Sequence, residues 1–181
     1  MGLFSRTGEA LIGIDISTTS IKLVELAGSG DGYKLKALVI VPLPRDAIVE
    51  NTVIDSMAVS QGLLDALEIA HPSTQKAAIA VSGNAVIIKT VRMPTTTEFE
   101  LETQIEFEAD QHVPYDIDDV YLDFEILGEV PDSPGEMEVV LAACKREVID
   151  DYQLVLSEAG IEATCVDCAV FALENALETT A

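Results

Sequence analysis

One stretch near the amino terminus constrains this chain more than any other. It is an apolar run with a single carboxylate, Asp15, followed at once by a turn rich in hydroxyls. Residues 11–16 are predicted to form a strand, and residues 20–26 are predicted to form a second one. The pattern therefore predicts a β-hairpin whose two strands flank a polar turn at residues 17–19.

The residues of this turn suit the phosphates of a nucleotide. Hydroxyls and turn amides can bind phosphate oxygens. A nearby carboxylate can hold the Mg²⁺ that accompanies them, directly or through water. Lys22 adds a positive charge close by. The alternative is structural, because Ser and Thr are common in turns, where they hydrogen-bond to their own backbone. A carboxylate inside an apolar strand is less common, since burying it is costly without a partner.

Length and composition limit the class of protein. The chain has 181 residues, of which 49% are hydrophobic. That suits one domain of ordinary size, or two small subdomains that share a core. No apolar run approaches the ~20 residues that a membrane-spanning helix needs. Residues 1–6 lack the apolar segment of a signal peptide. We therefore expect a soluble, cytosolic protein that does not insert into a membrane.

The net charge of −22 limits the partners. A polyanionic surface repels the phosphate backbone of nucleic acids and the headgroups of anionic lipids. It attracts basic peptide segments and speeds their encounter with the protein. An equally good explanation is a source that grows in high salt, where strong screening makes acidic surfaces tolerable.

The three cysteines do not form a disulfide framework. Cys165 and Cys168 make a Cys-x-x-Cys pair, yet His71 and His112 are far from it in sequence, so a zinc site lacks its second pair of ligands. Thioredoxin-like motifs open a helix, whereas Cys165 is predicted to lie in a strand. We interpret these cysteines and Cys144 as buried structural thiols.

Apolar periodicity predicts the remaining strands and helices. Residues 28–32 are rich in glycine and predict a loop. The first helix is expected to bury a stripe of Leu63, Leu67 and Ala70, with Leu64 beside them. Predicted strands span 33–41 (with Leu35, Ala37, Val39 and Val41 on one face), 76–81, 86–93, 120–126, 138–143 and 161–166; predicted helices span 57–70, 98–112, 146–159 and 169–177.

The helix at 98–112 is strongly acidic. Thr97 and Glu100 have the spacing of a capping box, with Thr97 as N-cap. Its inward face is predicted to carry Leu101, Ile105 and Ala109, and its outward face Glu98, Glu102, Glu106 and Asp110.

The order of elements predicts an α/β protein with two parts. Residues 1–84 and 161–181 are expected to form a core subdomain, with a mixed sheet and helices packed on it. Residues 85–160 read as an inserted strand–helix–strand–strand–helix subdomain, which is long enough for a small core of its own.

Three strands with a phosphate turn, followed by a helix and a fourth strand, resemble half of the actin-like ATPase (ribonuclease H-like) fold. That family has the pattern Asp-x-Gly/Ser-Thr-x-x-x-Lys, which here occupies residues 15–22. The place of the insert is similar to that in the division protein FtsA. Several motifs in order further resemble the PilM family of type IV pilus assembly proteins: residues 13–26, 80–87, 104–115 and 141–147.

This resemblance implies a nucleotide site. Asp15 would hold Mg²⁺ through water; the β- and γ-phosphates would contact Ser17, Thr18, Thr19 and Ser20, and Lys22 would add charge. Members of the family usually have a second actin-like domain, which carries the other phosphate loop and the adenine loop. With that domain absent, ATP is expected to bind weakly or not at all, and we expect no hydrolysis and no catalytic residue.

The resemblance also implies a partner. PilM-like proteins bind the cytosolic N-terminal tail of the inner-membrane protein PilN in a groove near the junction of core and insert. Glu102, Glu106 and Gln111 are the expected contacts. The protein would be cytoplasmic and held at the inner membrane through its partner, and the pilus assembly ATPase and other platform proteins are further candidate partners.

Two alternatives remain open. A sugar-kinase-like ATPase or phosphotransferase would need a catalytic group opposite the γ-phosphate and a complete cleft, and neither is readable here. An FtsA-like protein would normally carry a C-terminal amphipathic membrane helix, and none is readable either.

Overall fold

The computed structural model describes residues 10–29 and 32–180. Its contacts divide the chain into two compact units, one of residues 1–80 and 150–181 and the other of residues 81–149. We call the first the core unit and the second the inserted unit. The expectation of no signal peptide at residues 1–6 lies outside the described residues, as do the central residues 30 and 31 of the loop predicted at 28–32.

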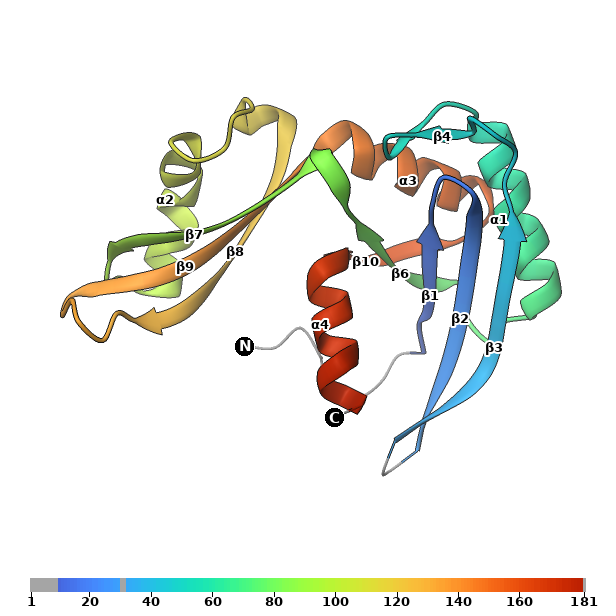
Figure 1. Ribbon diagram of the computed structural model, residues 1–181, viewed down its shortest axis with the longest axis horizontal. Helices are drawn as coiled ribbons and strands as arrows, with labels where there is room; N and C mark the ends of the chain where they lie inside the picture. Colours follow the sequence, from blue (N-terminus) through green and yellow to red (C-terminus); the bar gives the residue numbers. More distant parts are fainter. Residues whose placement is uncertain (1–9, 30–31, 181) are drawn as a thin grey trace. The chain divides into compact units, whose positions relative to one another are not determined.

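The core unit contains a five-stranded mixed sheet in the order β10-β6-β1-β2-β3 (Figure 1). β1 is antiparallel to β2 and parallel to β6, and β2 is antiparallel to β3. The elements are β1 (Ile12–Ile16), β2 (Ser20–Ser29), β3 (Gly32–Pro42), β4 (Ile48–Val49), β5 (Thr52–Val53), α1 (Ser56–Ala70), β6 (Lys76–Val81), β10 (Glu162–Cys168) and α4 (Ala169–Thr180). The chain re-enters this unit within α3 (Arg146–Glu158).

Helix α1 packs on this sheet through a face that combines large and small residues. Asp55 caps its N-terminus by accepting from the Ala58 N–H, and His71 ends it in the left-handed conformation at φ 44°. Of the predicted apolar stripe, Leu63 is fully buried and Leu67 and Ala70 are half-buried, whereas Leu64 beside them is 43% exposed. The buried residues of the helix are Val59, Ser60, Gly62, Leu63 and Ala66.

Gly62 lies where α1 closely approaches the neighbouring side chains of the core unit. A Cβ atom at this position would lie 2.9 Å from Cδ2 of Leu43 and 3.0 Å from Cδ1 of Ile21. The helix is therefore tightly packed at a position where it has no side chain.

Substituting Gly62 by leucine is expected to destabilise the core unit by about 1–3 kcal/mol, because added carbons must displace well-packed neighbours. Urea denaturation of Gly62→Leu measures this. The matched control is Gln61→Leu, which adds a leucine at the neighbouring exposed position. Equal urea midpoints of unfolding for the two variants would show that the close packing at Gly62 does not contribute to stability.

A β-bulge turns one predicted side chain of β3 to the other face of the sheet. The register shifts between Glu25 and Leu26, so that Ala37 lies opposite Glu25 while Leu35 lies opposite Leu26. Lys36 is the extra residue. The prediction that Leu35 shares the buried face of Val39 was therefore wrong, and Leu35 is 54% exposed.

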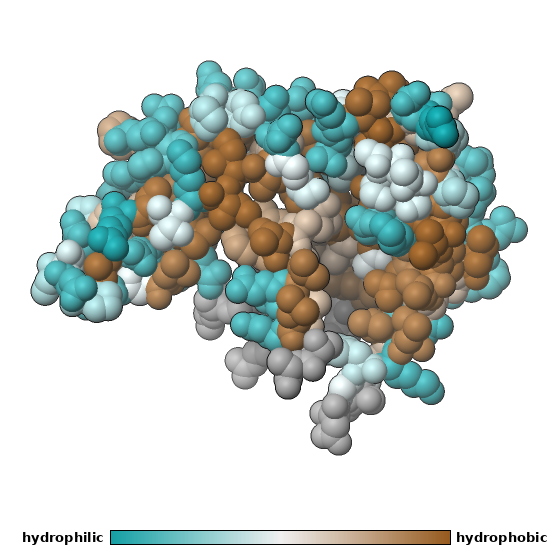
Figure 2. All heavy atoms as spheres, viewed as in Figure 1, coloured by the Kyte–Doolittle hydropathy of each residue, from teal (hydrophilic) through white to brown (hydrophobic). Residues whose placement is uncertain are grey.

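The face to which the bulge turns Leu35 is unusually apolar. Figure 2 shows apolar side chains gathered over β2 and β3. The exposed large side chains of the two strands are Leu26 (46%), Tyr33 (65%), Leu35 (54%), Leu38 (60%) and Ile40 (60%).

A short hairpin between β3 and α1 is absent from the sequence-based prediction. β4 and β5 are joined by Glu50 and Asn51, with φ values of 50° and 67°. Two successive positive φ values are typical of a type I′ hairpin turn, for which glycine is the usual signal. Neither residue of this turn is a glycine, so the turn was not predicted from the sequence.

The inserted unit is a three-stranded antiparallel sheet in the order β7-β9-β8, with α2 packed on it. Leu101, Ile105 and Ala109 of α2 are buried as predicted. The predicted capping box is confirmed by the Thr97 Oγ1 that accepts from the Glu100 N–H at 3.2 Å. The elements are β7 (Val86–Pro94), α2 (Glu98–Asp110), β8 (Val120–Glu129) and β9 (Glu136–Lys145), with single 3-10 turns at Gly83–Ala85 and Ile117–Asp119.

Candidate functional sites

The turn between β1 and β2 is held by its own serines. The backbone N–H and the Oγ of Ser17 both donate to the carbonyl of Ser20, at 3.1 and 2.9 Å. The Leu43 N–H donates to the carbonyl of Thr19 at 2.9 Å, which anchors the turn to the end of β3. The sequence's hydroxyl-rich run therefore forms a defined loop, as the structural interpretation of such turns requires.

Three of the predicted nucleotide-binding residues converge beside this turn. Asp15 and Lys22 are cross-strand neighbours in the hairpin, with Nζ of Lys22 2.5 Å from Oδ2 of Asp15. The same Nζ lies 3.5 Å from Oγ of Ser17. Asp15 avoids the cost of burying a carboxylate in an apolar strand, because its side chain is 57% exposed. An ion pair this exposed contributes at most about 1 kcal/mol to stability.

The other hydroxyls of the turn face solvent. Thr18 and Thr19 are exposed, and among the residues that the structure describes neither hydroxyl has a hydrogen-bond partner. No group of three or more metal-binding side chains occurs in the described part of the chain. One exposed carboxylate with free hydroxyls and an ammonium suits Mg²⁺ that arrives with phosphate and keeps most of its waters. The residues therefore fit the group.

The predicted partner residues lie on α2 in the inserted unit. Glu102 and Glu106 are exposed and one turn apart. Gln111 is the C-cap of the helix and borders a shallow, open hollow of about 390 Å³. The hollow is lined by Ile87, Lys89, Gln111, His112, Val113 and Pro114. Of the three predicted contacts, only Gln111 therefore borders it.

Lys89 is the part of this site that sequence reasoning missed. Its Nζ donates to the carbonyl of His112 at 2.8 Å, at the C-terminal end of α2. A cation this close to the end of the helix, which has Gln111 as its C-cap, stabilises the negative end of the helix dipole. A lone lysine in a predicted strand is the only signal, and the strand-to-helix distance cannot be read from it.

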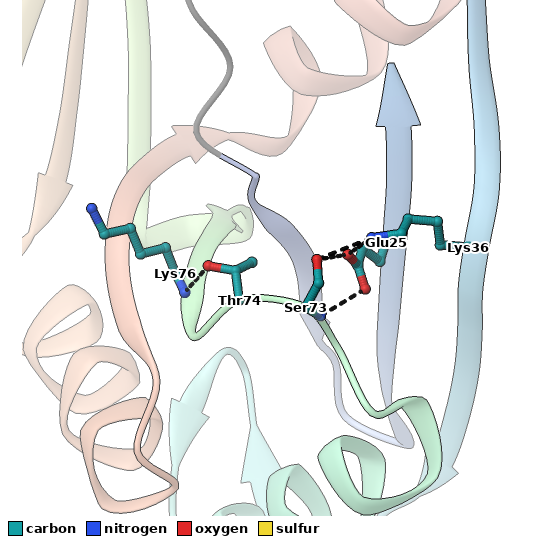
Figure 3. A network of polar contacts seen from close by, with 5 residues as sticks. All are labelled: Glu25, Lys36, Ser73, Thr74 and Lys76. Atoms are coloured by element: carbon teal, nitrogen blue, oxygen red, sulfur yellow. Dashed lines mark hydrogen bonds and ion pairs between the residues drawn. The ribbon is translucent and has the colours of Figure 1, made fainter. Parts of the chain in front are cut away.

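The core unit also contains a buried carboxylate, Glu25, that was not predicted from the sequence (Figure 3). Glu25 is 3% exposed and accepts from Nζ of Lys36 at 2.6 Å and from the Ser73 N–H at 3.1 Å. The Ser73 hydroxyl also donates to Glu25. The bulge at Lys36 brings the ammonium to the buried side of the sheet, so the network joins the β2–β3 pair to the loop before β6.

This network predicts a pH dependence of stability. The Lys36 and Ser73 hydrogen bonds lower the pKa of Glu25 from 4.5 to about 2. The unfolded chain binds the proton near pH 4.5 and the folded one only near pH 2. Stabilisation is therefore complete above about pH 4.5 and is lost as the pH falls towards 2.

The melting temperature of Glu25→Gln is expected to fall by several degrees at pH 7 and to approach the wild-type value near pH 2. Thermal unfolding followed by circular dichroism at several pH values measures both effects. Glu68→Gln, at an exposed position of α1, is the control. A constant difference across this pH range would show that the carboxylate of Glu25 is not the stabilising group.

The cysteines carry no evident chemistry. None of the three forms a disulfide. Cys144 is buried as predicted, whereas the prediction was wrong for Cys165 and Cys168, which are only half-buried. Cys165 lies in β10, as predicted. Burial, with a smaller effect of the Asp167 charge, raises the pKa of the Cys165 thiol, which disfavours the reactive thiolate.

Comparison with known proteins decides the family. The family model described as type IV pilus assembly protein PilM matches residues 13–181. The chain belongs to this PilM family. The resemblance in the turn at residues 15–22 is thus part of a match over nearly the whole sequence.

Two solved structures are similar to this PilM-family chain. A chain of the PilM–PilN type IV pilus biogenesis complex has 28% sequence identity and a TM-score of 0.84, over 95% of this chain and 51% of that one. The cytoplasmic domain of EpsL, an inner-membrane component of the type II secretion system of Vibrio cholerae, has 13% identity and a TM-score of 0.59, over 91% of this chain and 59% of that one. The second likeness shows the fold alone.

These matches confirm the predicted α/β core with a mixed sheet. The chain spans about half the length of the PilM-containing chain that it matches. Among the described residues, no helix is both long and apolar enough to span a bilayer.

Proposed function

We propose that this PilM-family chain binds the cytosolic N-terminal tail of PilN and thereby joins the inner-membrane platform of the type IV pilus to its assembly machinery. The observation that carries the proposal is the similarity to the PilM–PilN complex, with a TM-score of 0.84 over 95% of the chain. Through this tail the protein is held at the cytoplasmic side of the inner membrane. The pilus assembly ATPase and other platform proteins are further candidate partners.

The acidic α2 supports a basic tail as ligand. Glu102 and Glu106 offer exposed carboxylates, and Gln111 adds an amide at the border of the hollow. Complementary charge speeds encounter and fixes the register of the bound segment. The hollow's apolar wall, from Ile87, Val113 and Pro114, suits one apolar side chain of the tail.

Calorimetric titration with a synthetic peptide of the PilN tail tests this function. We expect binding with a dissociation constant near or below about 10 μM. A peptide of the same composition in scrambled order is the control. No heat of binding, or equal binding of both peptides, would contradict the proposal.

A weaker, separate activity is nucleotide binding. Asp15 would hold hydrated Mg²⁺, the phosphates would contact Ser17, Thr18, Thr19 and Ser20, and Lys22 would supply charge. Bound Mg²⁺ neutralises phosphate charge. Because the turn would contact only the phosphates, we expect weak ATP binding and no hydrolysis.

Asp15→Ala is expected to remove the Mg²⁺ dependence of ATP binding. In the wild type we expect a dissociation constant of about 1 mM or weaker, which ligand-observed NMR can measure. Glu125→Ala, at an exposed position of β8, is the control. If Mg²⁺ strengthens binding equally in Asp15→Ala, the assignment of this carboxylate fails.

A further inference from the structure

The outward face of α2 exposes two phenylalanines. Leu101, Ile105 and Ala109 face the core of the inserted unit, and on the opposite side Phe99 and Phe107 are 76% and 73% exposed. An aromatic ring buries 150–250 Å² when it packs. Two such rings left in water on one helix face are therefore a surface suited to a partner.

These rings form a row along the helix. Residues 99, 103, 107 and 111 are four apart and so follow one ridge of an α-helix. Phe99 and Phe107 are eight residues apart, which places them about 12 Å apart along the axis. The ridge ends at Gln111, at the border of the hollow that contains Ile87 and Pro114. The apolar anchors of a docked segment would need the same spacing, close to two helical turns.

The neighbouring ridge is wholly acidic. Glu98, Glu102, Glu106 and Asp110 are also four apart, and all four are exposed. Like charges at this spacing repel and destabilise a helix. Within residues 10–29 and 32–180, none of these carboxylates forms an ion pair or hydrogen bond with another side chain. A row of positive charges laid beside this ridge would relieve the repulsion.

We propose that this face of α2 docks a basic amphipathic helix of a partner protein. Two apolar side chains of that helix pack against Phe99 and Phe107, and its lysines or arginines lie along the acidic ridge. A second copy of this chain is a poor occupant, because each copy has a net charge of −22 and would present acidic surface to acidic surface. The inference deepens the proposed function, since Glu102 and Glu106 belong to the same helix.

The test uses a synthetic helix of about 18 residues with leucines on one face and lysines on the other. Its control has the same composition with the leucines spread over all faces. Fluorescence anisotropy is expected to show micromolar binding of the amphipathic probe and binding of the control at least about tenfold weaker. Equal binding of the two probes would reduce the interaction to unspecific charge attraction and overturn the inference.

Variants locate the binding on α2. Phe99→Ser with Phe107→Ser is expected to weaken probe binding at least about tenfold, whereas Leu127→Ser, which removes a 56% exposed leucine from β8, leaves it unchanged. Both residues are exposed, so circular dichroism should show folded variants. Undiminished binding by the double variant overturns the inference. So does a wild-type dimer, seen by sedimentation, that the same substitutions dissociate.

The tail peptide separates this inference from the proposed function. If the tail fails to bind while the amphipathic probe binds through Phe99 and Phe107, the proposed function fails alone. If the tail binds and the probe does not discriminate between the variants, the docking surface fails alone.

Discussion

Leu141→Ala is expected to destabilise the inserted unit by about 2–5 kcal/mol, the loss found when a buried leucine leaves a cavity. Leu141 is 2% exposed and lies on β9, the central strand of the three-stranded sheet. It belongs to the cluster that includes Leu101 and Ile105 of α2. Because this unit is small, a loss of that size is a large part of its total stability.

Urea denaturation followed by NMR resonances of residues 81–149 measures this effect within the inserted unit itself, since two units need not unfold together. Val140→Ala is the matched control, because Val140 is the next residue of β9 and points to the half-exposed face. We expect the control to cost less than about 1.5 kcal/mol. Equal losses for the two variants would contradict the assigned inward face of β9.

The double charge reversal Glu102→Lys with Glu106→Lys is expected to weaken binding of the PilN tail by about 10- to 100-fold, because each reversal replaces attraction by repulsion. The wild-type affinity should itself fall when salt is raised from about 50 to 500 mM, since screening is strong at that concentration. Calorimetry at both salt concentrations measures both effects.

Glu125→Lys with Glu129→Lys is the matched control for this reversal. It makes the same change in net charge on exposed positions of β8. If the two double variants weaken tail binding equally, only the overall charge matters and α2 is not the binding element. If neither weakens it, tail binding does not depend on Glu102 and Glu106.

Elements with strong local signals could be predicted from the sequence. Alternation of apolar residues indicates β8, a continuous apolar run indicates β9, and the Thr97–Glu100 spacing fixes the start of α2 within one residue. The turn at residues 17–19 could be predicted because a hydroxyl-rich segment between two apolar runs is typical of a turn. Its neighbours Asp15 and Lys22 meet because antiparallel pairing places them opposite each other.

Features that depend on distant contacts could not be predicted. One such contact is the close approach of Gly62 in α1 to Leu43, which periodicity does not reveal. The bulge that turns Leu35 outward depends on the pairing of Glu25 with Ala37 across the sheet. The hollow at the end of α2 is likewise lined by Lys89 of β7, and no spacing in the sequence links this lysine to His112.

The most direct test of the central claim, that this chain captures the PilN tail through the acidic helix of its inserted unit, is amide hydrogen exchange with and without the tail peptide. We predict slower exchange in residues 104–114, where α2 ends at the hollow, and unchanged exchange in β3. Slower exchange confined to the core unit, or no change anywhere at saturating peptide, would contradict the claim.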